Sequence, residues 1–466
     1  MAYNPEQPVF ETQVKSSIKL LYGIEDRPKT WWESLFYAWQ VTLVDFTPFI
    51  WAGAFVSIAG LPDTIIPTMI SACFLAMGIA TLIQTTIGNR LPIVQGPSSS
   101  VLTAMGGVTA IYGFPAMWGA VIVGGLLEAV LGFSRVIGKI RRFIPPVVTG
   151  SVVATIGFVA ARIAVGWIFQ TGKPIHLALA LIAFLLALIL KFKGKGIWSQ
   201  GFILISVVIV GVGLATVLGE YDWAKVAAEP WIALPRLFPF KGFDGTDKAV
   251  VFITAAIIGG FTGYIGSIFE SLGDYAATCA VSGEVYRVKH INKGIAAEGL
   301  GCMVSGFIGA LPVTSYTQNI GIIAATGIAS RFITQVAAVM FLLYGLSPKL
   351  AMALACIPRS VVGGVFAISA SLIMFSGIEV IISEAQSFEN NLVAGTAIGA
   401  GVMVPYFSAT TGAQWVNTLS NFGKMYMTNS VFIAVTVGVI MNLICNHWFK
   451  SKKDKTVVEA EESAAN

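Results

Sequence analysis

The sequence predicts an all-α polytopic membrane protein with an internal duplication. Of the 466 residues, 56% are hydrophobic and 11% are charged, whereas soluble domains carry about 25% charged residues. Uncharged apolar runs of about 20 residues, the length that crosses the hydrocarbon core as a helix, recur from Ser34 to Ile444. Two further apolar segments are too short to span and follow polar stretches. A soluble helical enzyme is the least favoured alternative.

The spanning helices are predicted where long apolar runs stand between polar or glycine- and proline-containing stretches. They cover Ser34–Ile58, Ile65–Ile87, Met117–Phe133, Val147–Phe169, Leu177–Leu190, Gly201–Leu218, Val250–Phe269, Gly294–Leu311, Ile333–Leu346, Leu350–Phe375, Leu392–Phe407 and Ser430–Trp448.

The two short segments, Ser100–Ile111 and Ile320–Ala329, occupy corresponding places in two halves of the chain. LPIVQGPSSSVLTAMGGV aligns without a gap to LPVTSYTQNIGIIAATGI, and each combines a β-compatible polar stretch with a half-length helix. Short, broken elements in corresponding positions indicate a transporter's binding site near the bilayer midplane. We therefore expect two inverted repeats joined in Gly219–Lys248.

Lys and Arg predict the orientation of the chain. They cluster between Arg135 and Arg142, Lys191 and Lys195, Arg287 and Lys293, and Lys450 and Lys455. If both short segments enter the membrane, all four clusters and both termini lie on the cytoplasmic side of the cell membrane. The first thirty residues contain no apolar signal segment.

The net charge and the cysteine and histidine content limit the kinds of ligand and cofactor that we expect. The net charge of +5 is dispersed in clusters between apolar spans, so nucleic acid is not expected. Five cysteines and three histidines show neither paired nor metal-ligand spacing. We predict no metal, no cofactor and no enzymatic activity.

Glu270 and Asp274 are the most informative ionisable residues, because a charged side chain inside a membrane segment is costly and usually functional. Their spacing of four places both carboxylates on one helix face. Two like charges there favour proton uptake by one of them, and a carboxylate can accept N–H groups of a planar heterocycle. The alternative is that the pair lies at a water boundary and caps the next loop.

A polar run, Thr314 to Asn319, precedes the second short segment. It is predicted to be an extended strand lining a cavity, with the next helix presenting its N-terminus at mid-depth. Gln318 can donate and accept, and Gly321 permits close backbone approach. The alternative is an external loop in which Asn319 caps a helix.

The first half supplies weaker candidates. Ser98 and Ser99 lie in the counterpart of the polar run. Gln40 and Asp45 lie in the first span, and for Asp45 we favour an interhelical hydrogen bond over a ligand role. Glu298 and Glu128 are candidates for interhelical pairing, with Arg162, Arg331 or Arg359 as possible partners.

At this point the sequence resembles the nucleobase–ascorbate transporter family. QNIGIIAATG (Gln318–Gly327) matches that family's signature completely: Gln, Glu or Pro, then Asn-x-Gly, four residues, Thr, and Arg, Lys or Gly. FESLGD resembles its Glu-Ser/Thr-x-Gly-Asp segment. Further similar segments follow in the family's order over nearly the whole chain: GLLEAVLG, PPVVTG, EGLG and PRSVVGG.

The resemblance implies fourteen transmembrane segments in two inverted repeats of seven, with strand-plus-half-helix elements as segments 3 and 10. It implies a core domain that holds the site and a gate domain that forms a homodimer. The expected division is 1–33 cytoplasmic, 34–135 core (segments 1–4), 136–248 gate (segments 5–7) with the external loop, 249–346 core (segments 8–11), 347–449 gate (segments 12–14) and 450–466 cytoplasmic tail.

The resemblance also implies roles for matching residues. Glu270 and Gln318 would bind the base, Asn319 would shape the site, and Asp274 would serve proton coupling or core integrity. Thr326 belongs to the signature. Gln in its first position goes with xanthine- and urate-type purines, Glu with uracil and Pro with ascorbate.

Two departures from the family pattern concern the pocket. Val41 stands where the family usually has His, and Ser98–Val101 lacks the usual stacking aromatic. These departures could shift the substrate toward guanine, hypoxanthine or adenine.

The expected function is therefore elevator-like, proton-coupled import of a purine base, with Na⁺ use left open. The alternatives are a uracil:proton symporter of the same family and an anion transporter with the same architecture.

Overall fold

The computed structural model describes residues 5–9, 19–135, 145–233, 250–382 and 386–448. The chain divides into two compact units, which are described separately. Unit 1 comprises Met1–Ile137 and Ala160–Ser371, and unit 2 comprises Gly138–Val159 and Leu372–Asn466. Two helices, α6 (Pro146–Phe169) and α17 (Arg359–Ile382), have one end assigned to each unit.

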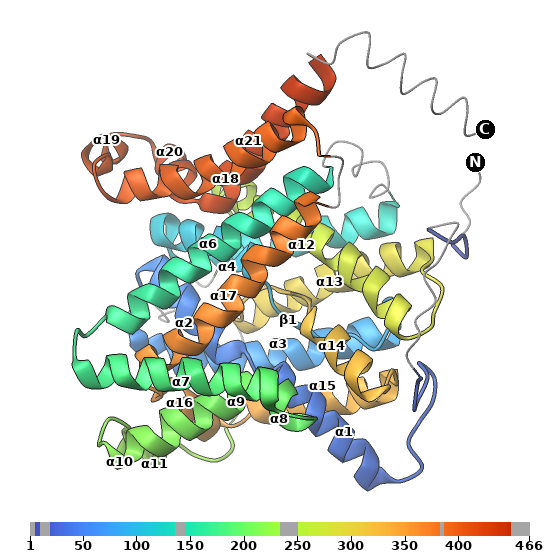
Figure 1. Ribbon diagram of the computed structural model, residues 1–466. Helices are drawn as coiled ribbons and strands as arrows, with labels where there is room; N and C mark the ends of the chain where they lie inside the picture. Colours follow the sequence, from blue (N-terminus) through green and yellow to red (C-terminus); the bar gives the residue numbers. More distant parts are fainter. Residues whose placement is uncertain (1–4, 10–18, 136–144, 234–249, 383–385, 449–466) are drawn as a thin grey trace. The chain divides into compact units, whose positions relative to one another are not determined.

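The other described elements of unit 1 are helices, apart from one pair of short strands (Figure 1). They are α1 (Trp31–Val44), α2 (Pro48–Ala59), η1 (Asp63–Ile65), α3 (Ile66–Thr86), β1 (Gln95–Pro97), α4 (Ser99–Ser134), α7 (Pro174–Lys193), α8 (Ile197–Gln200), α9 (Phe202–Ser206), η2 (Val207–Leu214), α10 (Ala215–Val217), α11 (Trp223–Ala228), α12 (Thr254–Val281), α13 (Val288–Ile308), β2 (Val313–Ser315), α14 (Gln318–Thr326), α15 (Arg331–Gly345) and α16 (Pro348–Ala355).

The strands β1 and β2 lie in the two polar stretches that the duplication aligned. They pair antiparallel, with Gln95 opposite Ser315 and Pro97 opposite Val313. Helix α4 follows β1 and helix α14 follows β2, so the two helices begin at opposite ends of the strand pair. The helical path of α4 is interrupted at Gly113, where φ is +78°. This break separates the short segment predicted at Ser100–Ile111 from the following span.

Glycines bring the helices of unit 1 into backbone contact. A Cβ on Gly125 of α4 would lie 2.7 Å from the carbonyl oxygen of Gly299 on α13, and one on Gly132 would lie 2.4 Å from the amide nitrogen of Ala296. Small residues at such crossings allow the close van der Waals packing that holds membrane helices together. The contact fixes α13 against α4, and thereby fixes Glu298 beside the strand pair.

The segment Leu20–Asp26 runs along the connection between α14 and α15. The Leu21 amide donates to the Gly327 carbonyl (2.7 Å), and the Ala329 amide donates to the Tyr22 carbonyl (2.9 Å). Glu25 forms ion pairs with Arg90 and Arg331. The hydrogen bond from Arg331 lowers the pKa of the Glu25 carboxyl. We call residues 20–26 the N-terminal strap.

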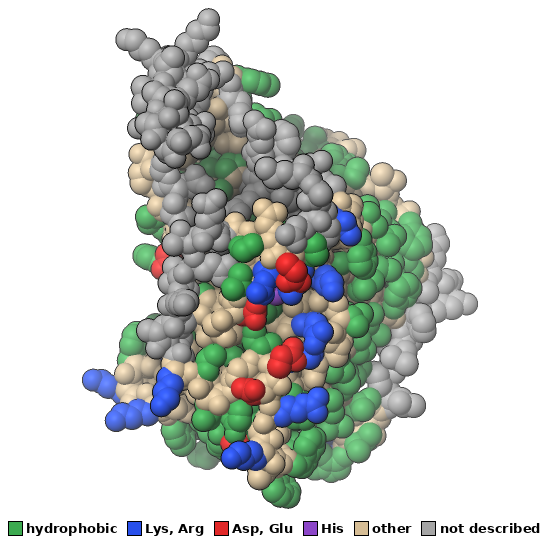
Figure 2. All heavy atoms as spheres, turned by 90° about the vertical axis from the view of Figure 1, so that its right-hand side faces the viewer, with side chains coloured by type: hydrophobic (Ala, Val, Ile, Leu, Met, Phe, Trp, Pro, Cys, Tyr) green, Lys and Arg blue, Asp and Glu red, His purple; other side chains and the backbone are tan. Residues whose placement is uncertain are grey.

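Residues 5–9 contact the connection between α12 and α13. The Val9 amide donates to the Tyr286 carbonyl (2.9 Å), and the Val288 amide donates to the Gln7 carbonyl (3.0 Å). Glu6 forms an ion pair with Lys289 (2.8 Å). Figure 2 shows acidic and basic side chains gathered on one face beside hydrophobic ones. The N-terminal residues therefore lie at the same end as the cluster at Arg287; the cytoplasmic assignment of that end remains a prediction.

The elements that belong wholly to unit 2 are α18 (Phe388–Ala409), α19 (Ala413–Asn417), α20 (Asn421–Thr428), α21 (Ser430–Leu443) and η3 (Ile444–Trp448). Val147, Val148, Val393, Ala394 and Cys445 form a buried apolar cluster. Helices α18 and α21 pack against each other (Figure 1).

The spans differ in detail from those predicted. Among the described residues, eight helices are long and apolar enough to cross a membrane, or ten if each of two bent pairs counts as one span. The run Leu350–Phe375 is divided between α16 and α17, because Pro358 offers no N–H and disfavours helix before it. The first span is interrupted after Val44, before α2. The count of fourteen segments remains a prediction.

Candidate functional site

A polar stripe on α12 forms the centre of the candidate site. Ser267, Glu270, Ser271, Asp274 and Tyr275 follow one another at spacings of three, one, three and one. At 3.6 residues per turn these positions share one face of the helix. The helix therefore presents two carboxylates and three hydroxyls along one line.

The carboxylates of Glu270 and Asp274 each contact the N-terminal end of a different helix. The Ser100 hydroxyl, in the first turn of α4, donates to Glu270 (3.3 Å). The hydroxyls of Ser315 and Thr317, directly before α14, donate to Asp274 (2.7 and 2.8 Å). Because helix N-termini carry partial positive charge, each carboxylate is placed where an anion is stabilised. Glu270 is partly exposed, whereas Asp274 is 4% exposed.

Glu298 of α13 accepts hydrogen bonds from hydroxyls of α12 and β2. Ser271 donates to both of its oxygens (2.7 and 2.8 Å), and Tyr275 donates to one of them (2.8 Å). Thr314 also donates to it (3.0 Å). The arginine partners considered from the sequence are wrong for both Glu298 and Glu128: Arg331 pairs with Glu25 and Arg359 with Asp63. Among the described residues, Arg162 forms no ion pair with either glutamate.

Hydroxyl groups also connect the carboxylate of Asp274 with that of Glu298. Ser315 donates to Ser271 (2.9 Å) as well as to Asp274. One hydrogen-bonded network thus extends from Asp274 through Ser271 to Glu298. Such networks hold their members in one geometry when every group is satisfied.

Helix α14 separates the predicted site residues between two faces. Gln318 and Gly321 are exposed on one face, and Gly321 has no atom within 4 Å of the place where a Cβ would lie. Asn319 is 1% exposed on the other face, where its amide donates to the Pro92 carbonyl (3.4 Å). Gln318 and Glu270, both in the described part of the chain, do not form a hydrogen bond with each other. Asn319 is therefore tied to the segment that precedes β1, whereas the Gln318 side chain is exposed.

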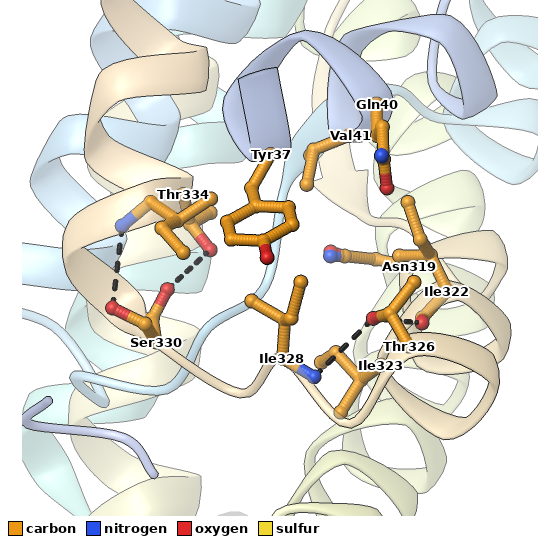
Figure 3. A pocket seen from close by; sticks show the side chains of 11 residues that line it. Tyr37, Gln40, Val41, Asn319, Ile322, Ile323, Thr326, Ile328, Ser330 and Thr334 are labelled. Atoms are coloured by element: carbon orange, nitrogen blue, oxygen red, sulfur yellow. Dashed lines mark hydrogen bonds between the residues drawn. The ribbon is translucent and has the colours of Figure 1, made fainter. Parts of the chain in front are cut away.

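A small pocket lies on the Asn319 side of α14, between α1, α14 and α15 (Figure 3). The side chains of Gln40 and Asn319 point into it, and Thr326 closes one side, where its hydroxyl accepts from the Ile328 amide (3.2 Å). The structure thus brings Gln40, Asn319 and Thr326 together, apart from the α12 carboxylates. The complete lining is Tyr37, Gln40, Val41, Asn319, Ile322, Ile323, Thr326, Ile328, Ser330, Ile333 and Thr334.

Ser98 and Ser99 are buried at the start of α4, and their role in substrate binding remains a prediction. The Ser98 hydroxyl accepts from the Val101 amide (3.3 Å) and caps α4, while Ser99 is 8% exposed. The serine that contacts a carboxylate is Ser100, which was not among the predicted site residues. Serine is a preferred N-cap residue, but this preference does not tell which serine in a run of three caps the helix and which contacts a carboxylate.

The hydroxyls of α12 were also missed, although their signal was present. Ser267, Ser271 and Tyr275 recur every four residues, and they share a face with Glu270 and Asp274.

For Asp45 the sequence predicted an interhelical hydrogen bond, and this prediction is wrong. Both carboxylate oxygens are buried without a hydrogen-bond partner. The chain turns there between α1 and α2, which leaves the side chain beside the break instead of on a helix face.

Comparisons with known proteins agree with the motifs. A model described as a permease family matches residues 32–410. The uric acid permease PucK of Bacillus subtilis (strain 168) is 29% identical over 357 residues, covering 73% of this chain and 80% of PucK. The xanthine permease XanQ of Escherichia coli (strain K12) is 29% identical over 416 residues, covering 83% of this chain and 86% of XanQ.

Solved structures share the fold at low sequence identity. The transmembrane domain of the cyanobacterial bicarbonate transporter BicA is 15% identical, with a TM-score of 0.54, covering 90% of this chain and 99% of that domain. The murine anion transporter Slc26a9, in its inward-facing state, is 12% identical, with a TM-score of 0.60, covering 95% of this chain and 76% of that protein. At these identities the likeness concerns the fold alone.

Proposed function

Since this chain belongs to the nucleobase–ascorbate transporter family and is a multi-pass membrane protein, we propose that it imports a purine base coupled to protons. The observation that carries the proposal is the placement of the two α12 carboxylates. Glu270 lies at the start of α4 and Asp274 at the start of α14. A ligand bound there would contact the starts of both half-helices.

Glu270 is proposed to bind the base directly. It is the partly exposed member of the pair, whereas Asp274 is buried, and its carboxylate can accept N–H groups of a purine. Gln318 is proposed to pair with the amide edge of the base, since it is exposed and offers both a donor and an acceptor. The open space beside Gly321 leaves room for the ring to approach the helix backbone.

Proton coupling is proposed to reside in Glu270 and Asp274. Two ionised carboxylates one helical turn apart repel each other, and the binding of one proton relieves that repulsion. Symport requires that the proton and the base favour the same state of the carrier, so that partly loaded carriers do not reorient. A proton shared with the base-binding residue meets that requirement.

A purine is favoured over uracil by Gln318 and by the relatives, which are named for uric acid and xanthine. The network around Glu298 is proposed to hold α12, α13 and β2 together. We further propose elevator-like movement of the predicted core domain (34–135 and 249–346). The predicted gate domain (136–248 and 347–449) would then form a homodimer.

Uptake of radiolabelled xanthine into proteoliposomes with an inward proton gradient tests the proposal. Glu270→Gln should abolish gradient-driven uptake. Loss of a hydrogen bond to a charged group, about 1.5–3 kcal/mol, should weaken xanthine binding about 10- to 150-fold. Glu229→Gln, the same change in a partly exposed external position, should transport normally.

Competition with unlabelled solutes distinguishes the alternatives. Uric acid, guanine and hypoxanthine should compete with xanthine, whereas uracil and bicarbonate should not. Full gradient-driven uptake by Glu270→Gln would contradict the role of Glu270. Competition by uracil alone would assign the chain to the uracil branch of the family.

A further inference from the structure

Asp45 and Glu128 are buried carboxylates that the proposed function leaves unused, and of the two Asp45 lies at a break between two helices whereas Glu128 lies within α4. Asp45 lies between α1, which ends at Val44, and α2, which begins at Pro48. Its side chain is 0% exposed, and neither carboxylate oxygen has a hydrogen-bond partner. In the part of the chain that the structure describes, no Lys, Arg or His forms an ion pair with it.

An ionised carboxylate in this position would carry a buried, uncompensated charge. Such a charge costs far more than the binding of a proton, so the group takes up a proton instead. Tyr316, which follows β2, interacts electrostatically with Asp45, and Cys73 on α3 and Glu270 on α12 lie around Tyr316 in turn. Tyr344 on α15 packs against Phe46, the next residue in the chain. None of these groups carries a positive charge. In this conformation Asp45 is therefore a neutral acid.

A proton suits the site better than a metal ion. Hard cations such as Ca²⁺ and Mg²⁺ take shells of about six or more oxygen ligands. Next to Asp45 in the chain, Phe46 packs its ring against those of Phe74 and Tyr344 (centroids 4.8 and 5.4 Å apart). Among the described residues, no cluster of His, Cys, Asp and Glu could hold a metal. A proton needs no such shell.

The break between the two helices gives the charge state of Asp45 a structural consequence. The C-terminal end of α1 carries partial negative charge and favours the neutral acid, whereas the N-terminal end of α2 carries partial positive charge and favours the carboxylate. The Thr47 amide donates to the Asp45 carbonyl (2.9 Å), which holds the turn between them. A rearrangement of this turn would change which end faces the carboxyl group.

The break is connected to the candidate site through Thr47. Its hydroxyl and that of Tyr316 form a buried hydrogen bond (2.8 Å). The Tyr316 ring lies directly against Gly96 of β1, where an added Cβ would be 2.2 Å from a ring carbon. Tyr316 follows β2 and precedes Gln318. A movement at the break between α1 and α2 would therefore displace Tyr316, and with it both strands and the start of α14.

We propose that Asp45 is a second proton-binding site of the carrier, separate from the α12 carboxylates. A proton from water binds its carboxylate on one side of the membrane, forming an O–H bond, and returns to water on the other side. The inference rests on the proposed function and deepens it, because two protons would then accompany each base.

The number of coupled protons tests this in proteoliposomes held at zero membrane potential. At steady state, each coupled proton multiplies the accumulation of xanthine about tenfold for each unit of pH difference. Wild-type protein should accumulate xanthine about 100-fold per unit. Asp45→Asn, which keeps the shape and removes the titration, should reach only about tenfold. Asp45→Glu should restore part of the difference, and Glu229→Gln should behave as wild type.

Either of two transport results would overturn the inference. Accumulation by wild type of only tenfold per pH unit would do so without any variant, as would Asp45→Asn with an unchanged dependence on pH difference. If Asp45→Asn does not fold, infrared spectra of the wild type decide the matter. The protonated-carboxyl bands should lose two groups when xanthine and protons are released, and loss of one or none contradicts the proposal. Uptake that ignores the gradient would instead remove the proposed function, and this inference with it.

Discussion

At the scale of single residues, two glycines near the site have opposite surroundings. Gly96 of β1 lies under the Tyr316 ring, and an added Cβ there would overlap ring carbons and the hydroxyl oxygen. Gly321 of α14 faces open space. The absence of a side chain therefore serves packing at Gly96, whereas at Gly321 it leaves room for a ligand.

This difference predicts two distinct phenotypes. Gly96→Ala should lower the thermal unfolding temperature in detergent, because the overlap displaces Tyr316 and overpacking typically costs about 1–3 kcal/mol. Gly321→Ala should unfold at the wild-type temperature or slightly above it, since alanine favours helix by about 1 kcal/mol. Its KM for xanthine should rise if the ring approaches the backbone there. An unchanged KM would place the ring away from Gly321.

At the scale of elements, α14 is held at its start by the strand pair, whose strand β2 directly precedes it, and at its end by a part of the chain distant in sequence. The strand pair determines where it begins, and the N-terminal strap meets it where it ends. Gly327, just after the helix, has φ of +71°, and an added Cβ would lie 2.7 Å from the Lys19 carbonyl oxygen, next to the strap, and 3.1 Å from the Leu21 amide nitrogen within it. Glycine at the last position of the signature thus admits the strap in this chain.

The backbone contacts of the strap should matter more than its ion pairs. Gly327→Ala combines a strained backbone with a steric overlap, so it should detach the strap and raise the KM for xanthine several-fold. Glu25→Gln removes exposed ion pairs, which contribute at most about 1 kcal/mol each. Its effect on KM should be small. A larger effect from Glu25→Gln than from Gly327→Ala would reverse this ranking.

The strap should also respond to acid. Because the pKa of Glu25 is lowered in the folded protein, its contribution is present at neutral pH and is lost as the pH falls through that lowered value. Proteolysis of the N-terminal segment should therefore become faster in acid for wild type. Glu25→Gln, already neutral, should show less of this increase.

At the scale of the whole molecule, alternating access predicts that the exposed face of α14 changes its accessibility. Ala324 lies on that face, one turn beyond Gly321. A cysteine at position 324 should react with an impermeant maleimide from one side of the membrane, and xanthine should change the rate. Of the native cysteines, Cys356 alone is not buried, so Cys356→Ser supplies the background. A rate that does not depend on xanthine would argue against movement of this face.

Local patterns in the sequence were sufficient to predict the class of protein and part of the candidate site. Apolar runs predicted membrane helices, and the family signature predicted a permease, which the comparisons confirmed. The spacing of Glu270 and Asp274 predicted one face of one helix. These features depend on residues within a few turns of each other, so they can be recognised without knowledge of the fold.

Only the tertiary structure decided which partners those residues meet. It assigned Glu270 to Ser100 and Asp274 to Ser315 and Thr317. It also surrounded Glu298 with hydroxyls where arginines had been considered, and it left Asp45 without a partner. Each of these outcomes depends on contacts between segments far apart in the chain. Such contacts are set by helix packing and strand pairing, which no local periodicity encodes.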